Sequence, residues 1–102
     1  MIELAAVVVD HVTAATNKLF TYSVPPELRG SVRCGTQVKV PFNRRWLTGY
    51  VTPEPAPEAP GIKPIAEIIA QDLFTVRTWA LARWISEYYL CHLVEAVRLI
   101  IP

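Results

Sequence analysis

Prolines and glycines divide the first 70 residues into short apolar runs, and this limits that part of the chain to short β-strands joined by turns. Residues 2–10 are rich in valine and too apolar to alternate, which predicts a strand in the middle of a core. Residues 19–24 alternate between two faces and end at Pro25-Pro26, where two missing backbone donors stop a hydrogen-bonded ladder. Both runs are therefore predicted as strands.

The next runs predict a hairpin, a proline-rich loop and one more strand. Residues 36–42 and 46–51 alternate on either side of the polar turn Asn43-Arg44-Arg45, as hairpin strands do. Residues 52–61 hold four of the nine prolines and no side chain suited to a core, which predicts an extended surface loop. In residues 62–70 the β-branched side chains favour a strand over a helix.

The carboxyl-terminal part of the chain has a helical pattern. Residues 76–90 contain no proline or glycine and are rich in alanine, leucine and aromatic residues, which predicts a helix beginning after residues 72–75. A second helix is predicted at about 93–100, before Pro102. The fold class is therefore mainly β, a small antiparallel barrel of five or six strands like an oligonucleotide-binding (OB) barrel, with carboxyl-terminal helices. We expect residues 1–102 to form a single domain.

The predicted helix at 76–90 has more apolar surface than this small domain needs. Its apolar and aromatic residues cover nearly the whole circumference, whereas an ordinary surface helix keeps one face polar. The chain also ends in the apolar segment Leu99-Ile100-Ile101-Pro102. We therefore expect the first domain of a longer protein, whose remaining domains pack on this helix.

Composition excludes several classes of protein. With 52% hydrophobic and 19% charged residues, the chain is too apolar for a disordered protein. No apolar run reaches the roughly 18 residues of a membrane span, and Met1-Ile2-Glu3 lacks the basic start of a signal peptide, so we expect a cytoplasmic protein without a membrane partner. Cys34 and Cys91 lie far apart in the sequence and predict neither a disulfide framework nor a metal site.

The net charge of +1 conceals an uneven distribution. Residues 1–50 carry six basic and three acidic side chains, a net charge of +3, whereas residues 51–102 carry four basic and six acidic side chains, a net charge of −2. A basic amino-terminal half suits a partner that bears phosphates, although a general nucleic-acid binder is usually far more basic. A nucleic-acid contact, if present, is therefore small.

Basic and aromatic residues alternate at the predicted hairpin turn, in Pro41-Phe42-Asn43-Arg44-Arg45-Trp46. The guanidinium groups of Arg44 and Arg45, together with Lys18, are candidate phosphate contacts, and an aromatic ring can stack on a base for about 1 to 3 kcal/mol. The alternative is a solvated turn in which Phe42 and Trp46 belong to the core. On the residues alone this alternative is favoured, because aromatic side chains are mostly buried.

Motifs that would indicate catalysis are weak. Asp10-His11 and Cys91-His92 each lack a third group to orient them, and adjacent residues of a strand or helix point in different directions. The sequence contains no Walker-type phosphate loop and no dinucleotide fingerprint. We therefore predict no catalytic residue and no metal ligand.

Several short motifs follow one another in a distinctive order and together cover essentially the whole chain. After the valine-rich run come Phe20-Thr21-Tyr22 with Val24-Pro25, Gly35-Thr36-Gln37-Val38-Lys39-Val40-Pro41-Phe42, Thr48-Gly49-Tyr50-Val51, the proline-rich loop, Ile62-Lys63-Pro64-Ile65 and Trp84-Ile85-Ser86-Glu87-Tyr88-Tyr89. This order and spacing resemble the amino-terminal domain of the primosomal replication-restart helicases, the PriA family, also called primosomal protein N′.

The resemblance implies a DNA-binding domain that recognises the 3′ end of the nascent leading strand at a stalled replication fork. In that family a shallow pocket receives the terminal nucleotide with its free 3′ hydroxyl, and the matching positions here are Phe20, Thr21, Asn43 and Lys63. Thr21 stands where the family often has aspartate, and its hydroxyl retains one hydrogen bond for a sugar hydroxyl without the strength of a carboxylate. Asn43 stands where the family often has glycine, and asparagine tolerates the left-handed backbone that such a turn needs.

For the longer protein the resemblance implies an ATP-driven 3′ to 5′ helicase of the bacterial nucleoid, with a winged-helix domain next and zinc-binding cysteines later. ATP, magnesium and zinc would belong to that longer protein, as would primosome and single-strand-binding partners. This domain would bind DNA without a cofactor and without hydrolysing ATP. The alternative hypothesis is a small β-barrel that binds a protein or an RNA through the aromatic helix.

Overall fold

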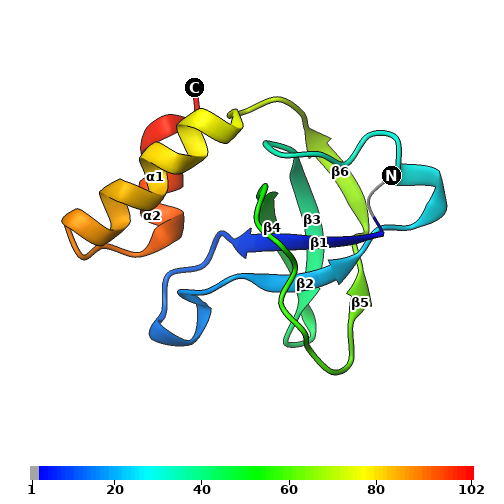
Figure 1. Ribbon diagram of the computed structural model, residues 1–102. Helices are drawn as coiled ribbons and strands as arrows, with labels where there is room; N and C mark the ends of the chain where they lie inside the picture. The colour runs from blue at the N-terminus through cyan, green and yellow to red at the C-terminus, as the bar shows by residue number, and fades with distance from the viewer. Residues whose placement is uncertain (1–2) are drawn as a thin grey trace.

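The computed structural model describes residues 3–102 and consists of a curled sheet with a pair of helices at one side (Figure 1). The sheet has six strands, and the helices follow it in the chain. The elements are β1 (Leu4–Val9), β2 (Phe20–Ser23), β3 (Gln37–Phe42), β4 (Arg45–Val51), β5 (Lys63–Pro64), β6 (Glu67–Ala70), α1 (Val76–Tyr88) and α2 (Leu93–Ile100), with single 3₁₀ turns η1 (Ala14–Thr16) and η2 (Pro26–Leu28). The predicted mainly β fold with carboxyl-terminal helices is confirmed.

The strands lie in the order β5-β2-β1-β4-β3-β6, and every neighbouring pair is antiparallel except β2 and β5. The two edges of the curled sheet are joined by consecutive residues. The amide of Ile65 donates to the carbonyl of Ser23 in β2 (3.0 Å), and the amide of Ala66 donates to the carbonyl of Lys39 in β3 (2.9 Å). One short segment therefore holds both edges and gives the sheet its barrel-like curl.

The single strand predicted for residues 62–70 is divided into β5 and β6, which pair with different strands. Pro64 has no amide hydrogen and Ile65, only 1% exposed, turns into the core. The prediction of β-structure in this segment was right, but the prediction of one continuous strand was wrong. The segment changes its pairing partner from β2 to β3 at Ile65.

The central strand β1 is buried on both faces, as its valine-rich sequence predicts. Val7 and Val9 pack inside the barrel with Tyr22 and Val40, whereas Val8 packs on the other face against the helices. Each fully buried valine contributes about 1.5 to 3 kcal/mol relative to an exposed one. The sheet is therefore the shared wall of two apolar clusters.

The β3–β4 hairpin turns through only two residues. Asn43 and Arg44 have φ angles of +48° and +65°, and Phe42 pairs with Arg45 across the turn. Two positive φ angles give the tight hairpin turn whose twist matches that of the flanking strands. Arg45, expected in the turn, is the first residue of β4.

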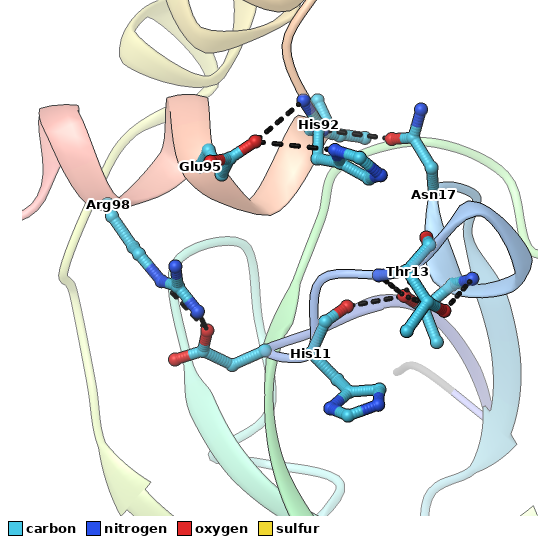
Figure 2. Close-up of polar contacts among 9 residues, drawn as sticks. His11, Thr13, Asn17, His92, Glu95 and Arg98 are labelled. Atoms are coloured by element: carbon cyan, nitrogen blue, oxygen red, sulfur yellow. Dashed lines mark hydrogen bonds and ion pairs between the residues drawn. The ribbon is translucent and has the colours of Figure 1, made fainter.

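The helices pack on the sheet through an apolar cluster, and polar contacts fix where they begin and how α2 is attached. In α1, the amide of Thr78 donates to Oγ1 of Thr75 (3.2 Å), which confirms the predicted helix start. At the start of α2, the amide of Leu93 donates to Oδ1 of Asn17 (2.9 Å), and Figure 2 shows Asn17 reaching this helix from the loop after β1. Further along α2, Nε of Arg98 donates to Oδ1 of Asp10 (2.9 Å).

Candidate functional site

A hollow of about 330 Å³ lies where the start of β2, the β3–β4 turn and the start of β5 meet. Three segments line it, residues 18–22, 41–43 and 57–63. The four residues expected to receive a terminal nucleotide, Phe20, Thr21, Asn43 and Lys63, therefore all line one hollow, and Lys18 lines it with them.

Phe20 is half-buried and is packed before any ligand arrives. Its ring meets the ring of Phe42 edge to face, with centroids 5.1 Å apart. The Nζ atom of Lys18 lies 5.3 Å from the Phe20 centroid, within cation–π distance. The Phe20 ring is therefore held in place by contacts within the chain.

Asn43 and Lys63 are exposed residues that line the hollow from different segments. Asn43 lies in the β3–β4 turn, and Lys63 is the first residue of β5. Asn43 occupies its left-handed turn position without a glycine, as its short polar side chain allows. Lys63 begins β5 and pairs in register with Tyr22 of β2. The parallel β2–β5 pair thus brings the backbone of Lys63 alongside that of Tyr22, and both residues line the hollow.

The Thr21 hydroxyl, expected to be free for a hydrogen bond to a sugar hydroxyl, instead donates a hydrogen bond within the chain. Thr21 is only 8% exposed, and its Oγ1 donates to the carbonyl oxygen of Pro57. The hydroxyl proton is therefore bonded within the chain, and only its acceptor capacity remains for a ligand.

Tyr22 also lines the hollow, and the sequence analysis did not include it among the site residues. Its hydroxyl donates to the carbonyl of Pro41 (2.8 Å), and burial raises the pKa of the phenol above its ordinary value. The phenol stays neutral and ties β2 to β3 beneath the hollow. The alternation in residues 19–24 placed Tyr22 and Phe20 on the same face, which was the available signal.

The segment between β4 and β5, residues 52–62, contains the predicted proline-rich loop and is hereafter called the strap, because it crosses the sheet in front of β1 and β2 to reach β5 (Figure 1). It is fixed at its start, where Oγ1 of Thr52 donates to the carbonyl of Ala6 (3.0 Å). Next, the carboxylate of Glu54 accepts from Nε1 of Trp79 (2.9 Å) and Nη2 of Arg83 (3.0 Å) in α1. The strap is a surface segment as predicted, but it is fastened to the domain and forms a wall of the hollow.

Outside the hollow, the hairpin carries an exposed aromatic ring. Trp46 is 58% exposed, and the Nζ atom of Lys39 lies 5.2 Å from its ring centroid. The favoured interpretation of Trp46 as a core residue was wrong. Trp46 pairs with Pro41 on the outer face of the hairpin, beyond the part that the helices cover.

The other candidate phosphate contacts do not line the hollow. Arg44 is exposed at the turn, and Nη2 of Arg45 lies 3.0 Å from Nε2 of His11. Of the three cations expected to meet phosphates, only Lys18 lies at the hollow, and the two arginines lie on the adjoining hairpin tip.

The pairs considered for catalysis make structural contacts instead. Asp10 binds Arg98 and accepts from the hydroxyl of Tyr50 (3.3 Å), and His92 lies 3.3 Å from the carboxylate of Glu95 at the start of α2 (Figure 2). Among residues 3–102, no three histidine, cysteine or acidic side chains gather in a metal-binding group. Within the same range, no helix has the length and apolarity needed to cross a membrane.

Comparison with known protein families matches residues 6–102 to the PriA family model described as "3'DNA-binding domain (3'BD)". The chain belongs to the PriA 3′ DNA-binding domain family. The predicted family is therefore confirmed, and so is the prediction that the chain is a DNA-binding domain. The roles of Phe20, Thr21, Asn43 and Lys63 in binding stay a prediction.

Curated relatives bear the same name, Replication restart protein PriA. The protein from Synechocystis is 35% identical over 105 residues, which cover 96% of this chain and 12% of that protein. The protein from Bacillus subtilis is 28% identical over 102 residues, covering 96% and 13%, and that from Treponema pallidum is 33% identical over 94 residues, covering 84% and 14%. The chain thus spans 12 to 14% of the length of these relatives.

Proposed function

We propose that the hollow binds the last nucleotide of a DNA strand that ends in a free 3′ hydroxyl, as the nascent leading strand does at a stalled fork. The observation that carries this proposal is the convergence of Phe20, Asn43 and Lys63 from three segments on one hollow of about 330 Å³. By this contact the domain would direct a longer ATP-dependent 3′ to 5′ helicase to such forks, for primosome assembly and replication restart.

Each side chain has a separate role in the proposed complex. The Phe20 ring stacks on the terminal base, a contact worth about 1 to 3 kcal/mol that tolerates any base. The ammonium groups of Lys18 and Lys63 pair with the phosphate that precedes the terminal sugar. An internal nucleotide is rejected because its continuing phosphate would meet the wall of the hollow and leave buried polar groups unpaired.

The tip of the β3–β4 hairpin would contact the strand before its last nucleotide. Arg44 and Arg45 are exposed next to Asn43, and the exposed Trp46 ring offers a surface on which a base can stack. These contacts neutralise only a few phosphates, so the affinity should fall with salt less steeply than for a protein that covers a long duplex.

The exposed aromatic surface of α1 is proposed to pack against further domains of a longer protein. The rings of Trp84 and Tyr88 stack with centroids 4.9 Å apart, although 52% of Trp84 and 65% of Tyr88 are exposed. ATP, magnesium, zinc, and primosome and single-strand-binding proteins would engage those other domains, in the bacterial cytoplasm at the nucleoid. The same surface supports the competing function, a barrel that binds a protein or an RNA through α1.

Binding to labelled oligonucleotides separates the two functions. We expect the chain to bind a forked or single-stranded DNA with a 3′ hydroxyl about tenfold more tightly than the same DNA with a 3′ phosphate, a difference of about 1.4 kcal/mol. Phe20→Ala and Lys63→Ala should each weaken binding, with thermal melts showing an intact fold, whereas Arg77→Ala on α1 should not. Equal affinity for the two ends would remove the proposed function.

A further inference from the structure

One acidic residue, the exposed Glu58, lines the hollow in addition to the expected site residues. Glu58 lines it from the strap, and it is the single acidic residue among those that line the hollow. Two cations, Lys18 and Lys63, line the same space. The charge in the hollow is therefore mixed, and the carboxylate stands on the segment that follows the Thr21 anchor.

Two lysines alone would favour a strand that ends in a 3′ phosphate over one that ends in a 3′ hydroxyl. A 3′ phosphate carries a charge of about −1.5 to −2 at neutral pH, as other phosphate monoesters do, and ammonium groups attract it more strongly than a neutral hydroxyl. A hollow that prefers a 3′ hydroxyl needs a group that accepts a hydrogen bond and repels an anion. An ionised carboxylate does both, because it is acceptor-only and negatively charged.

We infer that Glu58 determines the specificity for the 3′ hydroxyl, by accepting its hydrogen bond and repelling a 3′ phosphate or the phosphodiester of an internal nucleotide. This inference rests on the proposed function, since it assumes that the terminal sugar enters this hollow. Lys18 and Lys63 then bind the phosphate that precedes the terminal sugar, and Glu58 distinguishes a free 3′ hydroxyl from a 3′ oxygen that bears a phosphate.

Thr21 is the positioning residue for this carboxylate. Its hydroxyl donates to the carbonyl of Pro57, the residue immediately before Glu58. Pro57 and Pro60 restrict the backbone on both sides, because the proline ring holds φ near −65°. The hydrogen bond of Thr21 therefore sets where Glu58 enters the hollow, and threonine contributes without touching the DNA.

The experiment compares affinities of the 102-residue chain and its variants for one oligonucleotide ending in a 3′ hydroxyl, a 3′ phosphate or a 3′ deoxy sugar. Glu58→Gln keeps the shape and removes the charge, and Glu87→Gln on the exposed face of α1 makes the same charge change away from the hollow. We expect Glu58→Gln to reduce the preference for hydroxyl over phosphate about tenfold, mainly through tighter binding of the phosphate end. Glu87→Gln should leave the preference unchanged.

Thr21→Val and Thr21→Ser test the positioning role. Thr21→Val should lower the preference as Glu58→Gln does and speed amide exchange at Glu58, Ala59 and Gly61, whereas Thr21→Ser, which keeps the hydroxyl, should restore both. If wild type shows no preference, the proposed function fails and this inference fails with it. If wild type prefers the hydroxyl and Glu58→Gln keeps that preference, the proposed function stands and the inference about Glu58 is overturned.

Discussion

Removing the carboxylate of Glu54 should destabilise the domain, because this group satisfies a buried donor and fastens the strap to α1. Trp79 is 4% exposed, and its Nε1 donates to Oε2 of Glu54 at 2.9 Å. Nη2 of Arg83 contacts Oε1 of the same carboxylate at 3.0 Å. Glu54→Ala removes both contacts and leaves the indole N–H without its charged acceptor.

The hydrogen bond from Trp79 and the ion pair with Arg83 should contribute different amounts to the free energy of unfolding. A hydrogen bond from a buried donor to a charged acceptor contributes about 1.5 to 3 kcal/mol. The Arg83–Glu54 ion pair is worth less, because 43% of the Arg83 side chain and 27% of the Glu54 side chain are exposed, and water screens such pairs to about 0.2 to 1 kcal/mol. Glu54→Ala should therefore lower the free energy of unfolding by about 2 to 3 kcal/mol, and Arg83→Met by less than about 1 kcal/mol.

Urea and thermal unfolding measure this difference. In a domain of this size each 1 kcal/mol shifts Tm by about 4 to 8 °C, so Glu54→Ala should lower Tm by about 8 to 24 °C. Glu54→Gln should lie between wild type and Glu54→Ala, since its amide oxygen still accepts from Trp79. Glu27→Ala, at an exposed carboxylate in η2, is the control. If Glu54→Ala lies within about 0.5 kcal/mol of wild type, or if Arg83→Met costs as much, the assigned role of Trp79 is wrong.

Other perturbations have equally specific outcomes. Gly35 has a φ of +89°, and a Cβ there would lie 2.2 Å from the carbonyl oxygen of Phe74, so Gly35→Ala should destabilise by at least about 3 kcal/mol. Gly30→Ala, which meets no atom within 4 Å, should change the urea midpoint little, and similar costs for both would contradict the packing argument. The hydrogen bond and charge of Arg33 lower the pKa of Asp72 below 3.8, so this exposed pair stabilises the fold above about pH 4 and loses its effect as the pH falls through the folded pKa. In an NMR titration Arg33→Met should return the pKa of Asp72 toward 3.8, and an unchanged value would show that Arg33 is not the cause.

The candidate site was only partly predictable from the sequence. Phe20, Asn43 and Lys63 were predicted from the resemblance to the PriA family, and all three line the hollow. Glu58 and the anchored hydroxyl of Thr21 were not foreseen, because the Thr21–Pro57 contact joins residues 36 positions apart through a loop without periodicity. Trp46 was misassigned because alternation puts it on the same face of β4 as the buried Tyr50 but does not say how far along that face the helices extend.

By itself the sequence determined the type and approximate limits of the elements: the buried β1, the turn at Asn43 and the helices after Thr75 and His92. These features depend on neighbouring residues, through alternation, missing proline donors and helix caps, so local chemistry specifies them. Only the tertiary structure decided that residues 63–70 divide between two partners, that Glu54 fastens the strap to α1, and that Glu58 and Lys63 line the same hollow. Those arrangements depend on contacts between distant segments, whose free energies are settled by the packing of the whole domain.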